Sequence, residues 1–216
     1  MRDGEAKRRL AIVGNGPVAN GLARQIDSSD IVVRFNDAAY EPHRTGTRTD
    51  ILFLVNSGKT MQRRVFDPGF VASPIFQNAG RIVLPYHPDV IARYHPKPNI
   101  LSRAKGRKSD WTREAIAVFG RQGKEVSVLP PQFYEQCCLE LGIAEGDRRR
   151  LFPSTGFIGI KYALERFQHP EWQVELFGFS WEGWKRHAWE GERTWISDKI
   201  ASGNISMRVG ETRSSL

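Results

Sequence analysis

A glycine-rich turn near the N-terminus has the residue types and spacing of a phosphate-binding loop. The apolar run 10–13 is typical of a strand, and Gly14, Gly16 and Pro17 follow it directly. Proline suits the first turn of a helix, so these residues predict a helix from about residue 17 to 26. Unpaired backbone N–H groups at the positive end of such a helix attract an anion. A tight turn that binds nothing fits the same residues.

The same turn also satisfies a loose dinucleotide fingerprint. Gly14, Gly16 and Ala19 have the spacing G-x-G-x-x-A, and Asp37 lies near the position expected of an acidic ribose ligand. A dinucleotide-dependent oxidoreductase is therefore one interpretation of this region.

Two later segments carry further polar side chains. Ser154, Thr155 and Gly156 precede an apolar helical run, where a hydroxyl either caps the helix or helps to bind a phosphate or carboxylate; capping is the simpler interpretation. His187 has the ordinary pKa of a general base near neutral pH, although a single histidine is often structural. Nearby tryptophans are candidates for either core packing or stacking on a base or sugar.

The elements that must position these residues alternate along the chain. Strands are predicted at 10–13, 31–35, 51–55, 81–84, 126–129 and 174–177, and helices at 17–26, 111–119, 131–141 and 157–167. This order predicts an α/β, Rossmann-like fold with a mostly parallel sheet flanked by helices. We expect a flexible N-terminus at 1–9, a single domain at 10–203, an exposed basic loop at 102–113 and a mobile tail at 204–216.

Composition limits the partners without choosing among them. The 216 residues carry a formal net charge of +8, which attracts nucleotides, acidic glycans or membrane surfaces alike. The basic stretch at 103–113 matches no nucleic-acid-binding motif, so we expect no nucleic acid partner and allow peripheral membrane contact. The two cysteines, Cys137 and Cys138, are adjacent, and neither a signal peptide nor a transmembrane run is visible, which predicts a cytoplasmic protein.

Taken together and in this order, the three polar segments resemble the motifs of the sialyltransferase superfamily, glycosyltransferase family 29, in its bacterial sialyltransferase-like members. The family's large motif is matched by residues 12–16, 21, 26–27, 30–36 and 46–49, its small motif by 153–156 and 176–179, and its His-x4-Glu motif by His187 and Glu192.

The resemblance implies the sialyltransferase-type variant of the GT-A fold and an inverting, metal-independent transfer from a CMP-activated acidic sugar of the sialic acid or Kdo type. It implies that His187 is the catalytic base, that no cofactor is needed, and that a glycan or glycolipid is the acceptor. The donor-binding residues that it implies are Gly14, Asn15, Gly16, Asn36, Ser154, Thr155, Gly156, Gly178, Phe179 and Trp181. Arg186 or Lys185 would help to balance the leaving phosphate.

The sequence departs from the family pattern in two places. The paired cysteines of secreted animal members are missing, which agrees with a cytoplasmic chain. The aromatic-flanked second histidine that helps to hold phosphate in the family is also missing, and this keeps another interpretation open. The alternative is a non-catalytic nucleotide-binding accessory protein with the same fold.

Overall fold

The computed structural model describes residues 7–168, 170–180 and 184–208, which form an α/β structure around one sheet. The seven strands lie in the order β5-β4-β3-β2-β1-β6-β7, and every neighbouring pair is parallel. The predicted Rossmann-like class is confirmed. The strands are β1 (Arg8–Val13), β2 (Ile31–Phe35), β3 (Ile51–Phe53), β4 (Arg81–Leu84), β5 (Glu125–Val128), β6 (Trp172–Phe177) and β7 (Ile205–Arg208).

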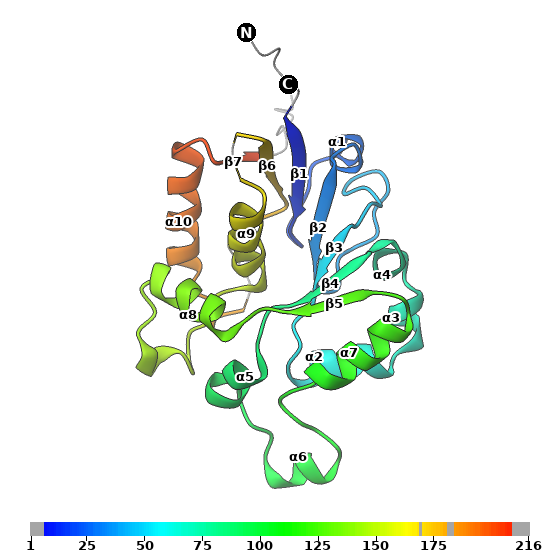
Figure 1. The fold of residues 1–216 in the computed structure, drawn as a ribbon, viewed down its shortest axis with the longest axis vertical. Helices are drawn as coiled ribbons and strands as arrows, with labels where there is room; N and C mark the ends of the chain where they lie inside the picture. The colour runs from blue at the N-terminus through cyan, green and yellow to red at the C-terminus, as the bar shows by residue number, and fades with distance from the viewer. Residues whose placement is uncertain (1–6, 169, 181–183, 209–216) are drawn as a thin grey trace, which may run out of the picture.

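Helices cover both faces of this sheet. Figure 1 shows α8, α9 and α10 on one side and α2, α3, α4 and α7 on the other. Their bounds are α1 (Ala23–Asp27), α2 (Gly58–Phe66), α3 (Pro68–Ala72), α4 (Pro74–Asn78), α5 (Pro88–Tyr94), α6 (Ile100–Ala104), α7 (Thr112–Arg121), α8 (Pro131–Glu140), α9 (Thr155–Arg166) and α10 (Trp189–Ala201), with a 3-10 turn at Glu145–Asp147.

Strand β1 shows how the core is divided between the two faces. Leu10 and Ile12 point into the cluster that includes α8 and α9, whereas Ala11 and Val13 point into a cluster with Ile26 of α1. All four side chains are almost fully buried. A strand in a covered parallel sheet has no solvent face, which is why this run is continuously apolar.

Strand positions are predicted well, but the ends of the domain are not. The expected flexible N-terminus is wrong for Arg8 and Arg9, which pair with Trp172 and Gln173 of β6. The expected mobile tail is wrong for 205–208, because these residues form β7 and pair with β6. Arg8 and Arg9 are both charged, and 205–208 is polar at alternate positions, so the composition of each segment resembles that of a tail.

One predicted helix and one predicted loop also differ from the structure. The helix expected at 17–26 is shorter in the structure, where α1 comprises only Ala23–Asp27. Residues 17–22 have no helical structure. The basic stretch 102–113 was expected to be a loop, but its first three residues, 102–104, belong to the short helix α6. Asn99 caps this helix by accepting a hydrogen bond from Ser102 N.

Candidate active site

The predicted polar segments meet at the carboxyl edge of the sheet. The chain passes from β1 towards β5 on one side and then returns to place β6 on the other side of β1. Ligands of open α/β sheets bind in the crevice at such a reversal. Here the loops after β1 and β6 border a cavity of about 240 Å³, which we call the first cavity. It is lined by Gly14, Asn15, Gly16, Phe35, Asn36, Ser154, Thr155, Gly156, Gly178, Phe179, Ser180, His187, Trp189 and Glu192.

The catalytic base and all the donor-binding residues that the family resemblance implies therefore lie around one cavity, within the described ranges. Trp181 lies outside the described residues. Sequence reasoning did not assign Phe35, Ser180 and Trp189 to the site, although each lies in or next to a predicted motif, and it gave Glu192 no role of its own.

Three glycines allow the two loops to touch. Gly14 N donates to Phe177 O and Gly16 N to Gly178 O, both at 2.8 Å. A Cβ atom on Gly14 would lie 2.5 Å from Gly178 O, and Gly178 itself has φ +66°. The expectation that these two amides are unpaired at a helix start is therefore wrong: they hold the loops together.

The two asparagines fix strand ends beside the cavity. Asn15 Nδ2 donates to Phe35 O at 3.1 Å, which ties the glycine loop to β2. Asn36 is the one non-glycine residue of the described chain with positive φ, and its Oδ1 accepts from Val55 N at 3.1 Å. Asparagine tolerates this conformation better than most residues because its short amide bonds locally. Both side chains thus have structural bonds as well as a position at the cavity.

The N-terminus of α9 supplies the positive end of a helix dipole to the first cavity. Ser154 caps the helix, as the simpler interpretation predicted, since its Oγ accepts from Phe157 N at 3.0 Å. Thr155 and Gly156 form the first turn and line the cavity. This turn, rather than the glycine loop, provides the helix start expected to attract an anion.

A buried carboxyl group holds the cap of α9 in place. Glu192 is only 1% exposed, and its two oxygens accept from Ser154 N and Ser154 Oγ, each at 2.6 Å. Burial raises the pKa of Glu192 to about 7. The carboxyl is part of the cavity wall, so its protonation changes the charge that an anion meets there.

His187 is held by the backbone next to this cap. Phe152 N donates to Arg186 O, and Ala188 N donates to Phe152 O. These two hydrogen bonds form a parallel β-bridge that holds the backbone on both sides of His187. Its Nδ1 lies 3.4 Å from Phe152 O. A carbonyl only accepts, so Nδ1 carries the proton and Nε2 has the free lone pair. Burial lowers the pKa of His187, which keeps the ring neutral at physiological pH.

A second cavity, of about 480 Å³, adjoins the first. Asn36, Thr155 and His187 line both, so the histidine stands on their common border. The other residues around the second cavity are Asp37, Val55, Ser57, Gly58, Lys59, Thr60, Arg64, Tyr86, His95, Pro96, Phe152 and Trp184.

Arginine, lysine and aspartate side chains distinguish this second cavity from the first. Arg64 is 1% exposed, and its Nε donates to Asp37 Oδ1 at 3.1 Å, while Arg63 reaches the other Asp37 oxygen at 2.7 Å. Asp37 therefore balances two arginines. It does not stand as a lone ribose ligand, and with no helix at the glycine turn this removes the structural basis of the dinucleotide interpretation.

His95 is a site residue that the sequence did not reveal. Its Nδ1 lies 2.9 Å from Ser57 Oγ, and the Tyr86 ring packs against it at 4.5 Å between ring centroids. Burial lowers the pKa of His95 to about 4, so this ring is also neutral. No local pattern marks it, because the α2 start and the chain after α5 meet only through the fold.

Arg186 does not face the first cavity. Its guanidinium donates to the carbonyl oxygens of Arg149 and Arg150 and stacks over the Phe152 ring at 4.9 Å. The suggestion that Arg186 balances a phosphate is wrong, because these carbonyls already hold its charge outside the cavity. Lys185 is not among the residues that line either cavity.

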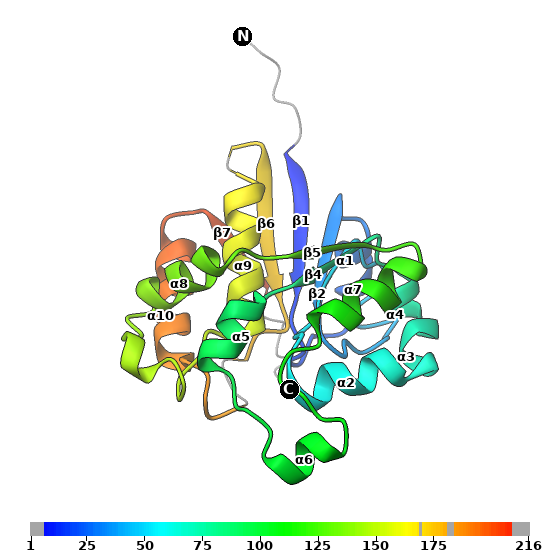
Figure 2. The same cartoon turned by 60° about the horizontal axis from the view of Figure 1, so that its bottom comes forward.

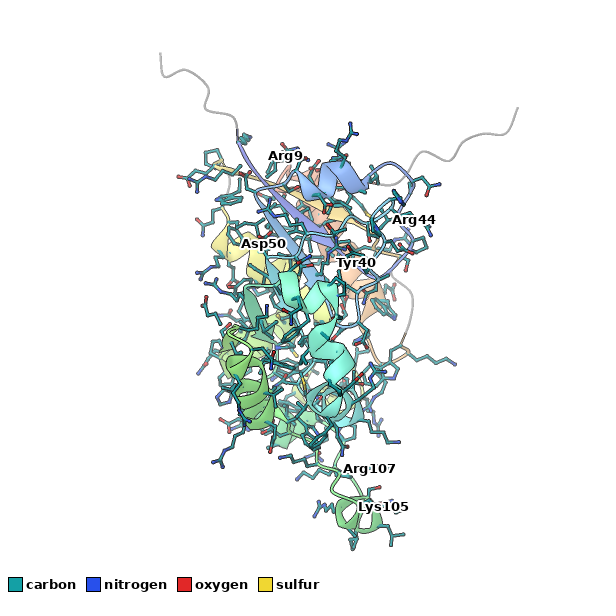
Figure 3. All side chains as sticks on the ribbon, turned by 90° about the vertical axis from the view of Figure 1, so that its right-hand side faces the viewer. Arg9, Tyr40, Arg44, Asp50, Lys105 and Arg107 are labelled. Atoms are coloured by element: carbon teal, nitrogen blue, oxygen red, sulfur yellow. The ribbon has the colours of Figure 1, made fainter. Side chains whose placement is uncertain are left out.

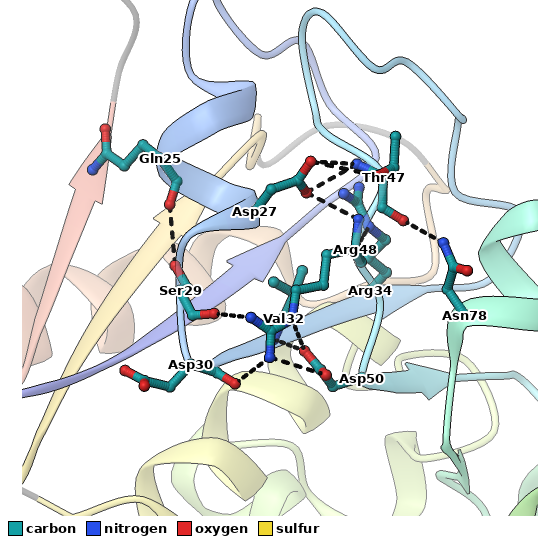
Figure 4. Close-up of polar contacts among 10 residues, drawn as sticks. All are labelled: Gln25, Asp27, Ser29, Asp30, Val32, Arg34, Thr47, Arg48, Asp50 and Asn78. Atoms are coloured by element: carbon teal, nitrogen blue, oxygen red, sulfur yellow. Dashed lines mark hydrogen bonds and ion pairs between the residues drawn. The ribbon is translucent and has the colours of Figure 1, made fainter.

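Much of the large motif builds a polar network away from both cavities (Figure 4). Asp27 accepts from Thr47 N and Arg48 N, each at 2.9 Å, and Arg48 Nε donates to Asp50 at 2.9 Å. Buried Arg34 donates to Arg48 O at 2.9 Å. These residues fix the loop between β2 and β3, so they position Asn36 rather than touch a ligand.

Residues 7–168, 170–180 and 184–208 contain neither a metal-binding cluster nor a membrane-spanning helix. In these ranges no group of three or more His, Cys, Asp or Glu side chains is arranged to hold a metal ion. No helix there has the length and apolar character needed to cross a bilayer.

Comparison with known proteins gives three kinds of match. The family described as "Glycosyltransferase family 29 (sialyltransferase)" matches residues 2–199. The "Urease operon 23 kDa accessory protein" of Rhizobium meliloti (strain 1021) is 25% identical over 206 residues, which is 93% of each chain. Two solved structures of a mammalian sialyltransferase, one in complex with Gal-beta-1-3GalNAc-ortho-nitrophenol, have TM-scores of 0.56 and 0.54 at 18% identity, covering 95% of this chain and 70% of theirs. These structures share the fold.

Proposed function

The chain belongs to glycosyltransferase family 29, the sialyltransferase family, and on that premise we propose that it is an inverting, metal-independent glycosyltransferase. The donor is a CMP-activated acidic sugar of the sialic acid or Kdo type, as the family resemblance implies, and it occupies the first cavity. The observation that carries the proposal is the position of His187 on the border between two adjoining cavities. A general base must reach the acceptor while it stands beside the donor.

In this proposal the phosphate of the donor lies against the first turn of α9. Thr155 and Gly156 present that turn to the cavity, and the helix dipole stabilises negative charge there. Asn15 and Asn36 contact the nucleotide beside Phe179. The described residues that line the first cavity include neither lysine nor arginine, so backbone amides and the helix dipole balance the leaving phosphate.

The acceptor occupies the second cavity, with its hydroxyl directed at His187. Nε2 takes the hydroxyl proton as the oxygen attacks the anomeric carbon, and the bond from that carbon to the CMP oxygen breaks on the opposite side. The configuration inverts, and CMP leaves. The buried environment that lowers the pKa of His187 keeps it ready to accept the proton near neutral pH.

The alternative is a non-catalytic accessory protein that retains the nucleotide cavity. The name of the Rhizobium meliloti relative, a urease operon accessory protein, favours it. A cytoplasmic location suits both alternatives and is supported by Cys137 and Cys138, which are buried and unpaired.

A thermal-unfolding screen separates the candidate ligands. CMP should raise the melting temperature more than UMP, GDP, NAD or FAD, since a ligand that binds only the folded chain stabilises it. No shift at millimolar CMP would rule out the donor assignment. Release of CMP from a CMP-sugar, unchanged by a metal chelator, would favour the enzyme; CMP binding without turnover would favour the accessory protein.

A further inference from the structure

The segment 97–108, which we call the finger, projects from the body of the protein. Figures 2 and 3 show α6 at the far end of this projection, away from the sheet. Its neck is closed, because Ser109 Oγ donates to Pro96 O at 2.8 Å. Its tip is shaped by local bonds, among them Ser102 N to Asn99 Oδ1 at 2.8 Å. The finger is thus a folded loop that presents a defined surface.

Two large aliphatic side chains stand in water at the tip of the finger. Ile100 is 82% exposed and the adjacent Leu101 is 76% exposed. A single exposed aliphatic residue is common on protein surfaces. Leu139 on α8, which is also 76% exposed, is an example. A pair on one turn of a projecting helix differs, because both side chains can enter the same apolar surface together.

Cations surround this apolar pair. The finger contains Lys97, Arg103, Lys105, Arg107 and Lys108 and no acidic residue. Lys108 pairs with Glu114 of α7. No described carboxylate lies within ion-pair distance of the other four. Figure 3 shows Lys105 and Arg107 on the projecting part. Their charge is available to an anionic partner.

We propose that the finger docks on the surface of an anionic lipid bilayer. Ile100 and Leu101 enter the boundary between head groups and acyl chains, and the surrounding cations lie over lipid phosphates. This combination of an apolar tip with basic flanks matches the chemistry of interfacial anchors. Single-stranded nucleic acid would use the cations and aromatic stacking, but the finger has no aromatic side chain and its aliphatic tip would gain nothing there.

Docking would hold the second cavity near the lipid surface. Pro96 stands at the neck of the finger and also lines that cavity, together with its neighbour His95. If the proposed function holds, an acceptor carried by a lipid head group is then within reach of His187. The docking proposal does not depend on transferase activity and is tested without it.

The test is sedimentation of the full chain with lipid vesicles. Wild-type protein should sediment with vesicles of phosphatidylcholine and phosphatidylglycerol, stay in solution with phosphatidylcholine alone, and dissociate in high salt. The variant I100D/L101D should lose most of this binding, whereas the matched control L139D should retain it. Ile100 and Leu101 are exposed and belong to none of the core clusters, so the melting temperature of I100D/L101D should equal that of the wild type.

Two triple variants with the same net charge as each other test the basic flank. Replacing Arg103, Lys105 and Arg107 with alanine should lower vesicle affinity about a hundred-fold, at about five-fold for each cation near the surface. The control replaces exposed Arg24, Arg121 and Arg193, on three other helices, and should lower affinity only a few-fold.

A dye on the tip reports insertion directly. The native thiols of Cys137 and Cys138 are buried, so a polarity-sensitive label attaches selectively to L101C or, as control, to L139C. Emission should shift to the blue with anionic vesicles for L101C alone. Absence of wild-type binding, equal losses in L139D and I100D/L101D, or equal losses in the two charge triples would each overturn the proposal. So would binding of an RNA oligonucleotide that needs the cations, with no vesicle binding.

Discussion

The two adjoining cavities meet at His187 but are built in different ways. The first is lined by glycines, amides, hydroxyls and one buried carboxyl, whereas the second contains Lys59, Arg64, Asp37 and His95. An anion in the first cavity therefore meets the backbone and a helix dipole. In the second, a ligand meets side-chain charges. The comparison teaches that close packing of the chain fixes the first cavity, whereas ion pairs fix the second. The two cavities should therefore respond differently to substitution, pH and salt.

Removal of the shared residue should have the largest effect. His187→Ala should lower the rate of sugar transfer by about 10²- to 10⁴-fold, the usual contribution of a general base, and leave the Kd for CMP within a few-fold. Initial-rate assays and calorimetry measure the two quantities. His43→Ala, at an exposed histidine away from both cavities, is the control. Unchanged transfer in His187→Ala would exclude the histidine as the base.

The buried carboxyl of the first cavity should make stability depend on pH. Glu192 has a pKa of about 7 in the folded chain and about 4.5 in the unfolded chain. Between these values the folded state holds a proton that the unfolded state releases, so stability falls as pH rises through this window and is level above it. The total is about 3 kcal/mol at 1.36 kcal/mol per unit.

Glu192→Gln should keep the bond from Ser154 N to the side-chain oxygen, reverse the bond with Ser154 Oγ, which can accept from the new amide NH2, and remove this pH dependence. Urea unfolding of both proteins between pH 4.5 and 8 measures the difference, and His187, whose lowered pKa gives the opposite slope, cancels in the comparison. Parallel curves for the two proteins would contradict the assignment. CMP binding by the wild type should also weaken above pH 7, when Glu192 is charged.

The loop contact behind the first cavity should be sensitive to a single methyl group. In Gly14→Ala the new Cβ meets Gly178 O at 2.5 Å, so we expect a loss of about 1–3 kcal/mol in the free energy of unfolding and weaker CMP binding. Gly146→Ala is the control, because a Cβ there meets nothing within 4 Å. Equal stability of the two variants by urea unfolding would show that the loops do not need this contact.

The second cavity should show the smallest and most salt-dependent effect. Lys59 is exposed at the start of α2, so Lys59→Ala should raise the KM for an acceptor up to about five-fold and leave CMP binding unchanged. The change should shrink at high salt, because exposed charges are screened. Lys199→Ala, on α10, should have no effect on either constant. A change in the Kd for CMP would remove the distinction between the cavities.

The first cavity was predicted from two sources: local patterns indicated the glycine turn, Ser154 and His187, and the family resemblance implied Asn36 and Gly178. The strand ends before Gly14, Asn36 and Gly178 were recognisable, and parallel strands bring their carboxyl ends to one edge. The Ser154 cap was also visible as a local pattern. What failed was the assignment of the glycine amides, since their partners, Phe177 O and Gly178 O, are more than 160 residues away in the chain.

The second cavity had no comparable local signal. His95, Arg64 and Tyr86 belong to separate connections after β3 and β4, and their contacts arise only when the helices pack. The edge strand β7 was missed for a related reason. Residues 205–208 are partly polar, and they form a strand only by pairing with the edge of β6.

A crystal structure of the CMP complex tests the central claim most directly. The account predicts the cytidine beside Asn15 and Phe179 in the first cavity, with its phosphate against the first turn of α9 and within reach of His187. A nucleotide bound instead in the second cavity, with its phosphate against the start of α2 and Lys59, would contradict it.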